Sequence, residues 1–312
     1  MKSGKIILLQ AALLIFLLPA VFFPFFRDGQ REIAQAQPPS APASYRISVR
    51  QGNTNVEMEL EEYVVGVVLA EMPAEFEQEA LKAQAVVART FAWKAFVTGG
   101  KHGDGSVCID PGCCQGYIAP GHFLQAYGTN EELARVRFAV SASAGQVLTY
   151  QGELIEATYF SSTAGYTEDA AAVWGSSYPY LVSKESPEEA DEESVAFSRA
   201  YLEKALGVRL EEDTDRWFTQ WEYTSGEGVA AVTVGGQRFS GTLLRKKLKL
   251  RSTAFSVTVQ NDAAVFQTRG YGHRVGMSQL GADAMAASGS AYQEILSYYY
   301  TGTELKSIEK EN

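Results

Sequence analysis

The chain has 312 residues, of which 46% are hydrophobic and 12% aromatic, and it carries 27 basic against 37 acidic side chains. From about Tyr45 onward this composition is typical of a globular protein, long enough for one large domain or two small ones. The net charge of −10 argues against nucleic-acid binding, which requires a basic surface.

The N-terminus carries an apolar segment at residues 6–26. About 20 such residues span a bilayer as a helix, and the preceding Lys2 and Lys5 favour a cytoplasmic N-terminus. We therefore expect a cytoplasmic tip at 1–5, an uncleaved transmembrane anchor at 6–26, and the rest of the chain outside the cell membrane. A long signal peptide is the alternative, against which the Ala-Gln-Ala at 34–36 lies well past the end of the apolar segment.

Residues 27–44 contain three prolines and few apolar side chains. Such a composition is typical of an extended, weakly structured linker. The globular part is therefore expected to begin at Tyr45.

Four segments after Tyr45 alternate apolar and polar residues around a short turn, which predicts β-hairpins. Their turns lie at Asn53, Gln151-Gly152, Gly235-Gly236 and Asn261-Asp262. Helical patterns lie between the hairpins, at 60–71, 73–96, 131–143, 196–206 and 278–300. The acidic run 186–194 predicts a solvated loop. Hairpins that are separate from helices predict an α+β fold with antiparallel sheet, in which a smaller subdomain can be inserted.

Glu71 is a candidate general acid. It continues the apolar stripe of one helical face, which consists of Val64, Val67 and Val68. Pro73 ends this helix near Glu71 and suits the start of the next one. A carboxyl group in an apolar environment keeps its proton more readily, as a general acid requires. From the residues alone, a structural role is the simpler interpretation, with Glu71 as a cap or paired with Lys82 or Arg89.

All three cysteines lie between residues 102 and 117. An exported cysteine pair most often forms a disulfide, and Cys108 can be paired with Cys113 or Cys114. Alternatively, His102, Cys108 and Cys114 provide one imidazole and two thiolates, which suit Zn²⁺. Free thiols are the third possibility.

A glycine-rich turn precedes the last helical pattern. Three glycines flank His273 before Ser278, where the helix is expected to begin. Such glycines allow positive φ and a close approach of a ligand. The spacing matches neither a dinucleotide fingerprint nor a phosphate-binding loop. The structural alternative is a tight connection, with Ser278 as a helix cap.

Taken together, these motifs resemble the stage II sporulation protein D family, SpoIID, whose relatives include the amidase modifiers called LytB. The resemblance extends from about residue 45 to 303 and implies one catalytic domain at 45–312. It is carried by the segments 71–92 (EMPAEFEQEALKAQAVVARTFA), 160–181 (FSSTAGYTEDAAAVWGSSYPYL), 238–255 (RFSGTLLRKKLKLRSTAF) and 270–282 (GYGHRVGMSQLGA).

The resemblance implies a lytic transglycosylase that cleaves the MurNAc–GlcNAc bond of peptidoglycan. The family acts on peptide-stripped glycan strands during spore engulfment, and its catalytic acid corresponds to Glu71. The C6 hydroxyl of the substrate attacks in place of water, so the product is a 1,6-anhydro-MurNAc end. Polar and aromatic residues of the other motifs are then expected to bind the glycan: Gln115, Tyr117, Ser161, Ser162, Thr163, Tyr178, His273, Arg274, Ser278 and Gln279.

The resemblance also concerns zinc. Some members of the family hold a zinc ion with a histidine and two cysteines, which correspond to His102, Cys108 and Cys114. Cys113 stands where those relatives have a histidine, and it is either a fourth ligand, a neighbour of the ion or a residue without a role. The zinc is expected to be structural.

The family further implies a membrane complex with a SpoIIM-like protein and a SpoIIP-like amidase. The expected location is the cell membrane, with the catalytic domain outside, or the mother-cell membrane facing the forespore. The alternative function is a non-catalytic peptidoglycan-binding scaffold or an activator of a partner amidase.

Overall fold

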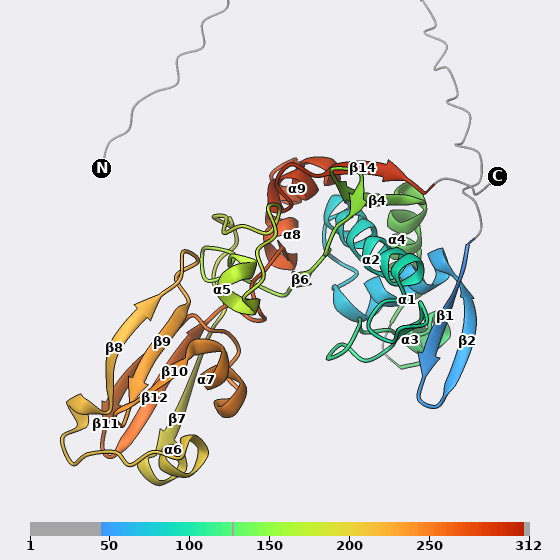
Figure 1. Ribbon diagram of the computed structural model, residues 1–312. Coiled ribbons are helices and arrows are strands. Elements are labelled where there is room, and N and C mark those ends of the chain that lie inside the picture. The colour runs from blue at the N-terminus through green and yellow to red at the C-terminus, as the bar shows by residue number, and fades with distance from the viewer. Residues whose placement is uncertain (1–44, 127, 309–312) are drawn as a thin grey trace, which may run out of the picture. The chain divides into compact units, whose positions relative to one another are not determined.

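The computed structural model describes residues 45–126 and 128–308, all of which belong to one compact unit (Figure 1). Helices and small, mostly antiparallel sheets alternate along this part of the chain. The predicted α+β class is therefore confirmed. The described residues form two hydrophobic cores, one around helices and one around strands.

Helices form most of the first core. Helix α2 lies at its centre and contacts α1, α4, α8 and α9. Its alanines at 80, 83, 85, 88 and 92 are fully buried, so neighbouring helices can approach closely. The helices of this region are α1 (Leu60–Glu71), α2 (Gln78–Thr98), α3 (Pro120–Ala126), α4 (Asn130–Ala142), α5 (Ala170–Trp174), α8 (Gln279–Ala287) and α9 (Tyr292–Tyr299).

Short strands accompany these helices. In one sheet β1 pairs antiparallel with β2 and parallel with β3; in another β4 lies between β14 and β5; and β6 pairs parallel with β13. These strands are β1 (Arg46–Gln51), β2 (Thr54–Glu59), β3 (Val107–Cys108), β4 (Gln146–Tyr150), β5 (Glu153–Leu154), β6 (Tyr159–Phe160), β13 (Met277–Ser278) and β14 (Glu304–Ser307).

The second core consists of buried residues between Leu202 and Phe266, a stretch that falls between segments of the first core. Two three-stranded antiparallel sheets, β10-β9-β8 and β11-β12-β7, pack there with helices α6 and α7. The elements are β7 (Glu192–Ser198), α6 (Arg199–Leu206), the short 3₁₀ helix η1 (Thr214–Arg216), β8 (Phe218–Tyr223), β9 (Val229–Val234), β10 (Gln237–Ser240), α7 (Gly241–Leu248), β11 (Phe255–Gln260) and β12 (Ala263–Arg269). A smaller inserted subdomain was expected; the structure has a second core in this stretch, within the same compact unit.

All four predicted hairpins are present, as β1–β2, β4–β5, β9–β10 and β11–β12. In the last three, both residues of the two-residue loop have positive φ, as type I′ turns require. Helix α1 has the predicted bounds. The pattern at 278–300 forms two helices instead of one, because Gly289 adopts a left-handed conformation at φ +97° between them. Residues 192–198 form β7, so the helix predicted at 196–206 begins only at Arg199.

The predicted location requires correction. Within residues 45–126 and 128–308, no helix has the length and apolar character needed to cross a bilayer, so a single-pass membrane protein is not supported. The predicted tip (1–5), anchor (6–26) and linker (27–44) lie outside the described residues.

Candidate active site

Glu71 is the last residue of α1, as predicted from Pro73. Met72 follows in an extended conformation, and its backbone N–H donates to Val68 O at 3.0 Å. The helix therefore ends at the point where the Glu71 side chain, which is half-buried, reaches a cavity. The alternative pairings of Glu71 with Lys82 or Arg89 are not present, because Lys82 pairs with Glu79 and Arg89 pairs with Glu61.

Two contacts hold Glu71 in place. The backbone N–H of Gly116 donates to Glu71 Oε1 at 2.5 Å, and the side-chain amide of Gln279 donates to the Glu71 backbone carbonyl at 2.9 Å. A Cβ atom at position 116 would lie 2.8 Å from Glu71 Oε1, which is closer than real Cβ contacts. Glycine at this position therefore permits the contact that orients the carboxylate.

The cavity beside Glu71 has a volume of about 760 Å³. Four of the predicted glycan-binding residues line it together with Glu71: Gln115, Ser161, His273 and Gln279. Segments that are far apart in the sequence thus meet at one place. Among the described residues that line the cavity, Glu71 is the sole carboxylate.

His273 is neutral at physiological pH. Burial, followed by the nearby Arg245 guanidinium, lowers the pKa of His273 to about 4, while a hydrogen bond with the Tyr159 backbone opposes this shift. The backbone N–H of Val275 donates to His273 Nδ1 at 3.1 Å, so the proton of the neutral ring is on Nε2. Both ring nitrogens of His273 thus bond the backbone, and the ring is held edge-on against Trp174 at a centroid distance of 5.2 Å.

A buried tyrosine network supports the floor of the cavity. Tyr63 OH donates to Gln115 Oε1 at 3.4 Å, and the Gln115 amide donates to Tyr159 OH at 3.2 Å. Burial first, and the Glu71 carboxylate second, raise the pKa of Tyr159 well above its usual value of 10. Tyr159 thus remains a phenol beside Glu71, and Gln115 is fixed in orientation.

The other predicted glycan-binding residues do not line this cavity: Tyr117, Ser162, Thr163, Tyr178, Arg274 and Ser278. Tyr117 stacks on Tyr63 at 5.8 Å, and Tyr178 packs against Tyr180. Ser278 caps α8 through Gly281 N and donates to Glu188. The structure gives these residues packing and capping contacts.

Arg274 is fully buried and belongs to an ion pair. Its guanidinium contacts Glu168 Oε1 at 2.5 Å, and the exposed fractions of the two side chains are 0% and 1%. Ser162 and Thr163 are likewise buried beside the glycine turn. The sequence pattern thus identified the segment but not which of its side chains faces the cavity.

Trp174, Tyr271 and Arg245 are among the cavity residues that the sequence analysis missed. Trp174 and Tyr271 are 42% and 49% exposed, so their rings offer open faces. Both lie within the motifs that carried the family resemblance, and an aromatic residue next to a glycine turn was the available signal. Arg245 comes from α7 in the second core; it lies in the segment 238–255 that also carried the resemblance, among several basic residues that nothing in the sequence distinguishes.

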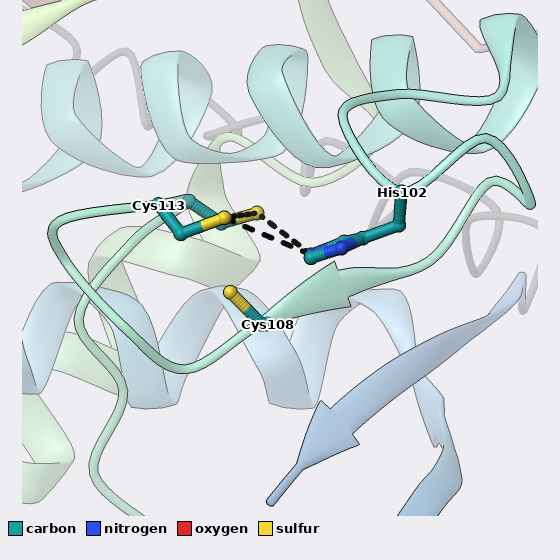
Figure 2. Close-up of side chains that lie close together, drawn as sticks. His102, Cys108 and Cys113 are labelled. Carbon is teal, nitrogen blue, oxygen red and sulfur yellow. Dashed lines mark hydrogen bonds between the residues drawn. The ribbon is translucent and has the colours of Figure 1, made fainter.

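The His102 cluster is a candidate metal centre. Figure 2 shows His102, Cys108 and Cys113 pointing toward one another, and the ligand atoms of these residues and Cys114 all lie within 4.8 Å of one another. The sulfurs of Cys113 and Cys114 are 3.9 Å apart. The Cys113 sulfur lies 3.9 Å from His102 Nε2, and the Cys114 sulfur lies 3.6 Å from it. A tetrahedral zinc site separates two sulfurs by about 3.8 Å and a sulfur from a nitrogen by about 3.6 Å. The spacing of Cys113, Cys114 and His102 therefore suits this ion, Cys108 lies close enough to join them, and the three thiols form no disulfide.

Local turns bring the four ligands together. Cys108 is the end of β3, which pairs with β1. The Asp110 carbonyl accepts hydrogen bonds from the backbone N–H groups of Cys113 and Cys114 at 3.0 and 2.8 Å. Gly103 and Gly105 have positive φ in the same loop. Without a cation, burial raises the pKa of the Cys114 thiol to about 12, so metal binding would release its proton.

The chain is similar to proteins of one family. It matches the family model described as stage II sporulation protein over residues 50–150. It is 38% identical over 287 residues to stage II sporulation protein D of Bacillus subtilis (strain 168), covering 89% of this chain and 82% of that protein. The protein of the same name from Bacillus amyloliquefaciens is 36% identical over 290 residues, covering 89% and 84%. The amidase enhancer of Bacillus subtilis (strain 168) is 31% identical over 299 residues, covering 78% of this chain and 40% of that protein.

Proposed function

Because this chain belongs to the stage II sporulation protein D family, whose role lies in sporulation, we propose that it is a lytic transglycosylase of peptidoglycan. Its substrate is the MurNAc–GlcNAc bond of glycan strands from which stem peptides have been removed during spore engulfment. The observation that carries the proposal is the cavity in which Glu71 is the sole carboxylate among the described lining residues.

Glu71 acts first as a general acid and then as a base. It gives its proton to the glycosidic oxygen as the bond from the anomeric carbon of MurNAc to that oxygen breaks. The C6 hydroxyl of the same sugar then attacks the anomeric carbon and returns its proton to Glu71. The new bond closes a 1,6-anhydro ring, the leaving sugar keeps the first proton, and no water is consumed.

The chemistry agrees with a lone carboxylate. Glycosidases that use water or a covalent intermediate need a second carboxylate about 5–9.5 Å from the first. The intramolecular hydroxyl replaces that nucleophile. The hydrogen bond from Gly116 to Glu71 supports the proposal, because a positioned acid must keep a fixed direction toward the leaving oxygen.

The remaining cavity residues bind the strand. Trp174 and Tyr271 present open rings on which sugar faces can stack. Gln115, Ser161 and Gln279 offer amide and hydroxyl groups, and neutral His273 adds ring surface to the wall without adding charge. The wall thereby supplies both apolar contact and orientation.

We further propose that His102, Cys108, Cys113 and Cys114 hold a structural zinc ion, with Cys113 as the fourth ligand. When bound, the ion cross-links the loop and fixes its three thiolates. These ligands would also help to position Glu71, because Cys114 lies two residues before Gly116, whose backbone N–H donates to the Glu71 carboxylate.

The similarity to an amidase enhancer favours an amidase as partner. A SpoIIP-like amidase that strips stem peptides would prepare the strands that this chain cleaves, and a SpoIIM-like protein would join them. A second candidate function is a non-catalytic scaffold or activator of that amidase, favoured by the name of the same relative, an amidase enhancer.

Product analysis tests the proposal. The full-length chain is incubated with peptide-stripped glycan strands, and mass spectrometry is used to detect 1,6-anhydro-muramyl ends. We expect such ends from the unaltered chain and none from Glu71→Gln. Strand binding without these ends would support the scaffold instead, and equal amounts from Glu71→Gln would remove Glu71 from its role.

A further inference from the structure

Arg245 brings a positive charge from α7 into the wall of the cavity. Its side chain is half-buried, and its Nε donates to the Arg251 backbone carbonyl at 3.2 Å. No carboxylate among the described residues forms an ion pair with it. A guanidinium keeps its charge inside a protein, so this one faces the cavity with free donors and no internal counter-ion.

The charge of the cavity wall is opposite to that of the whole chain. Two cations, Lys101 and Arg245, line the cavity against the one carboxylate of Glu71. The chain as a whole has a net charge of −10. An uncompensated, partly desolvated cation in an acidic protein indicates a place for an anionic ligand.

A second hollow continues from Arg245. It has a volume of about 630 Å³, and it shares Arg245 and Tyr271 with the cavity of Glu71. Lys246, Lys249 and Arg251 add three cations to its wall, against one acid, Glu193. Arg251 is partly neutralised by its pair with Asp191, and its guanidinium lies over the Tyr271 ring at 4.7 Å. This basic groove thus extends the cavity along one side of α7.

We propose that Arg245 and the basic groove recognise the free carboxylates of a peptide-stripped glycan strand, a specificity that rests on the proposed function. Each muramic acid carries a lactyl carboxylate once its stem peptide is gone, and an attached peptide converts that group into a neutral amide. Arg245 binds the carboxylate nearest the cavity by charge-assisted hydrogen bonds. Lys246 and Lys249 attract the carboxylates of the sugars that follow.

The continuity of the two hollows favours a glycan over other anions. A strand that has its scissile bond at Glu71 and a ring against Tyr271 must continue past Arg245 if it leaves through the groove. A lipid surface or a polyphosphate would meet the same cations without entering the cavity. Binding of such a ligand in place of the glycan is therefore an alternative outcome of the test.

Binding is measured with full-length Glu71→Gln, which prevents cleavage, and with two forms of the same strands. One form is peptide-stripped, and in the other the lactyl carboxylates have been chemically converted to amides. We expect the stripped strands to bind about 10- to 100-fold more tightly, as one or two charge-assisted hydrogen bonds provide. Arg245→Gln should remove most of this difference, Arg245→Lys should restore part of it, and Lys246→Gln with Lys249→Gln should reduce its dependence on salt.

The matched control is Lys247→Gln. Lys247 belongs to the same helix but donates to the Ala205 carbonyl at 3.1 Å and does not line the groove. The proposal would be overturned if both strand forms bound equally, if neither bound, or if Lys247→Gln had the same effect as Arg245→Gln. It would also be overturned if Arg245 were needed for binding to anionic phosphatidylglycerol vesicles while the protein did not discriminate between the two strand forms. If the unaltered chain produces 1,6-anhydro-muramyl ends but the two strand forms bind equally, only this inference is rejected. If stripped strands bind more tightly but no such ends are produced, only the proposed reaction is rejected.

Discussion

Glu71 is oriented by a backbone group and not by a cation. Gly116 donates to its carboxylate, and Gln279 donates to its backbone carbonyl. At the residue scale, the sequence could predict that α1 ends at Glu71, because helix periodicity and Pro73 together fix that end; the role of Glu71 as an acid was implied only by the resemblance. It could not identify Gly116 as its partner, because that contact joins segments 45 residues apart. Arg245 and Trp174 were missed for the same reason.

Gly116→Ala is expected to slow cleavage by about a hundredfold, since displacing a catalytic group by about 1 Å has effects of this size. The added methyl would lie 2.8 Å from Glu71 Oε1 and push it away. The rate of anhydro-muramyl end formation measures the effect. Gly121→Ala is the control, because a Cβ there meets nothing within 4 Å. A wild-type rate for Gly116→Ala would show that the contact does not position the acid.

His273 should make the protein less stable in mild acid. Its pKa is lowered to about 4 in the folded state, against 6.5 for an ordinary histidine, so between these values the unfolded chain binds a proton that the folded chain does not. The free energy of unfolding should therefore fall by about 2 kcal/mol from pH 7.5 to pH 5 through this group. Urea unfolding at both pH values should show a smaller decrease for His273→Gln, and an unchanged one for His122→Gln, whose side chain is exposed.

At the element scale, local patterns were informative and long-range pairings were not. The four hairpins could be predicted, because alternation and turn residues lie within about a dozen residues. The parallel pairs β1–β3 and β6–β13 involve two-residue strands whose partners are distant in sequence. A strand of two residues is too short to show an alternation of apolar and polar side chains. These strands nevertheless matter for the site, since β3 carries Cys108 and β6 carries Tyr159.

The loop that follows α2 is expected to contain one zinc ion per chain. Cys108→Ser should lose the ion, and removal of metal by a chelator should lower both the melting temperature and the cleavage rate, with recovery after zinc is returned. Elemental analysis and thermal unfolding measure these effects. Cys113→Ser should bind zinc more weakly than the unaltered chain does. A metal-free protein with a disulfide in its mass spectrum would contradict the prediction.

At the scale of the whole described region, a buried ion pair joins segments of the two cores. Arg274 contacts Glu168 and donates to the Gly226 carbonyl at 3.0 Å, while Thr224 donates to Glu168 at 2.9 Å. Gly226 and Thr224 lie in the turn between β8 and β9 of the second core. Composition and pattern predicted the fold class. They could not predict this junction, because its two charges are more than a hundred residues apart.

Removing one partner of this pair should destabilise the protein strongly. Arg274→Met leaves the Glu168 carboxylate buried without its cation, so we expect a loss of about 3–5 kcal/mol in the free energy of unfolding. Replacement of both residues by Met should cost less than Arg274→Met alone. Urea unfolding tests this, with Arg238→Met as a control, because the Arg238–Glu222 pair is exposed and worth at most about 1 kcal/mol. An equal loss in the single and double variants would contradict an uncompensated charge as the cause.

The segment from Cys114 to Ile118 is tethered at both of its ends. At one end Cys114 belongs to the His102 cluster, and at the other the Ile118 N–H donates to the Gly66 carbonyl of α1 at 3.0 Å. Gly116 lies midway between these two fixed ends. The direction of the Glu71 carboxylate therefore depends on two anchors close to Gly116, the His102 cluster on one side and the hydrogen bond to α1 on the other.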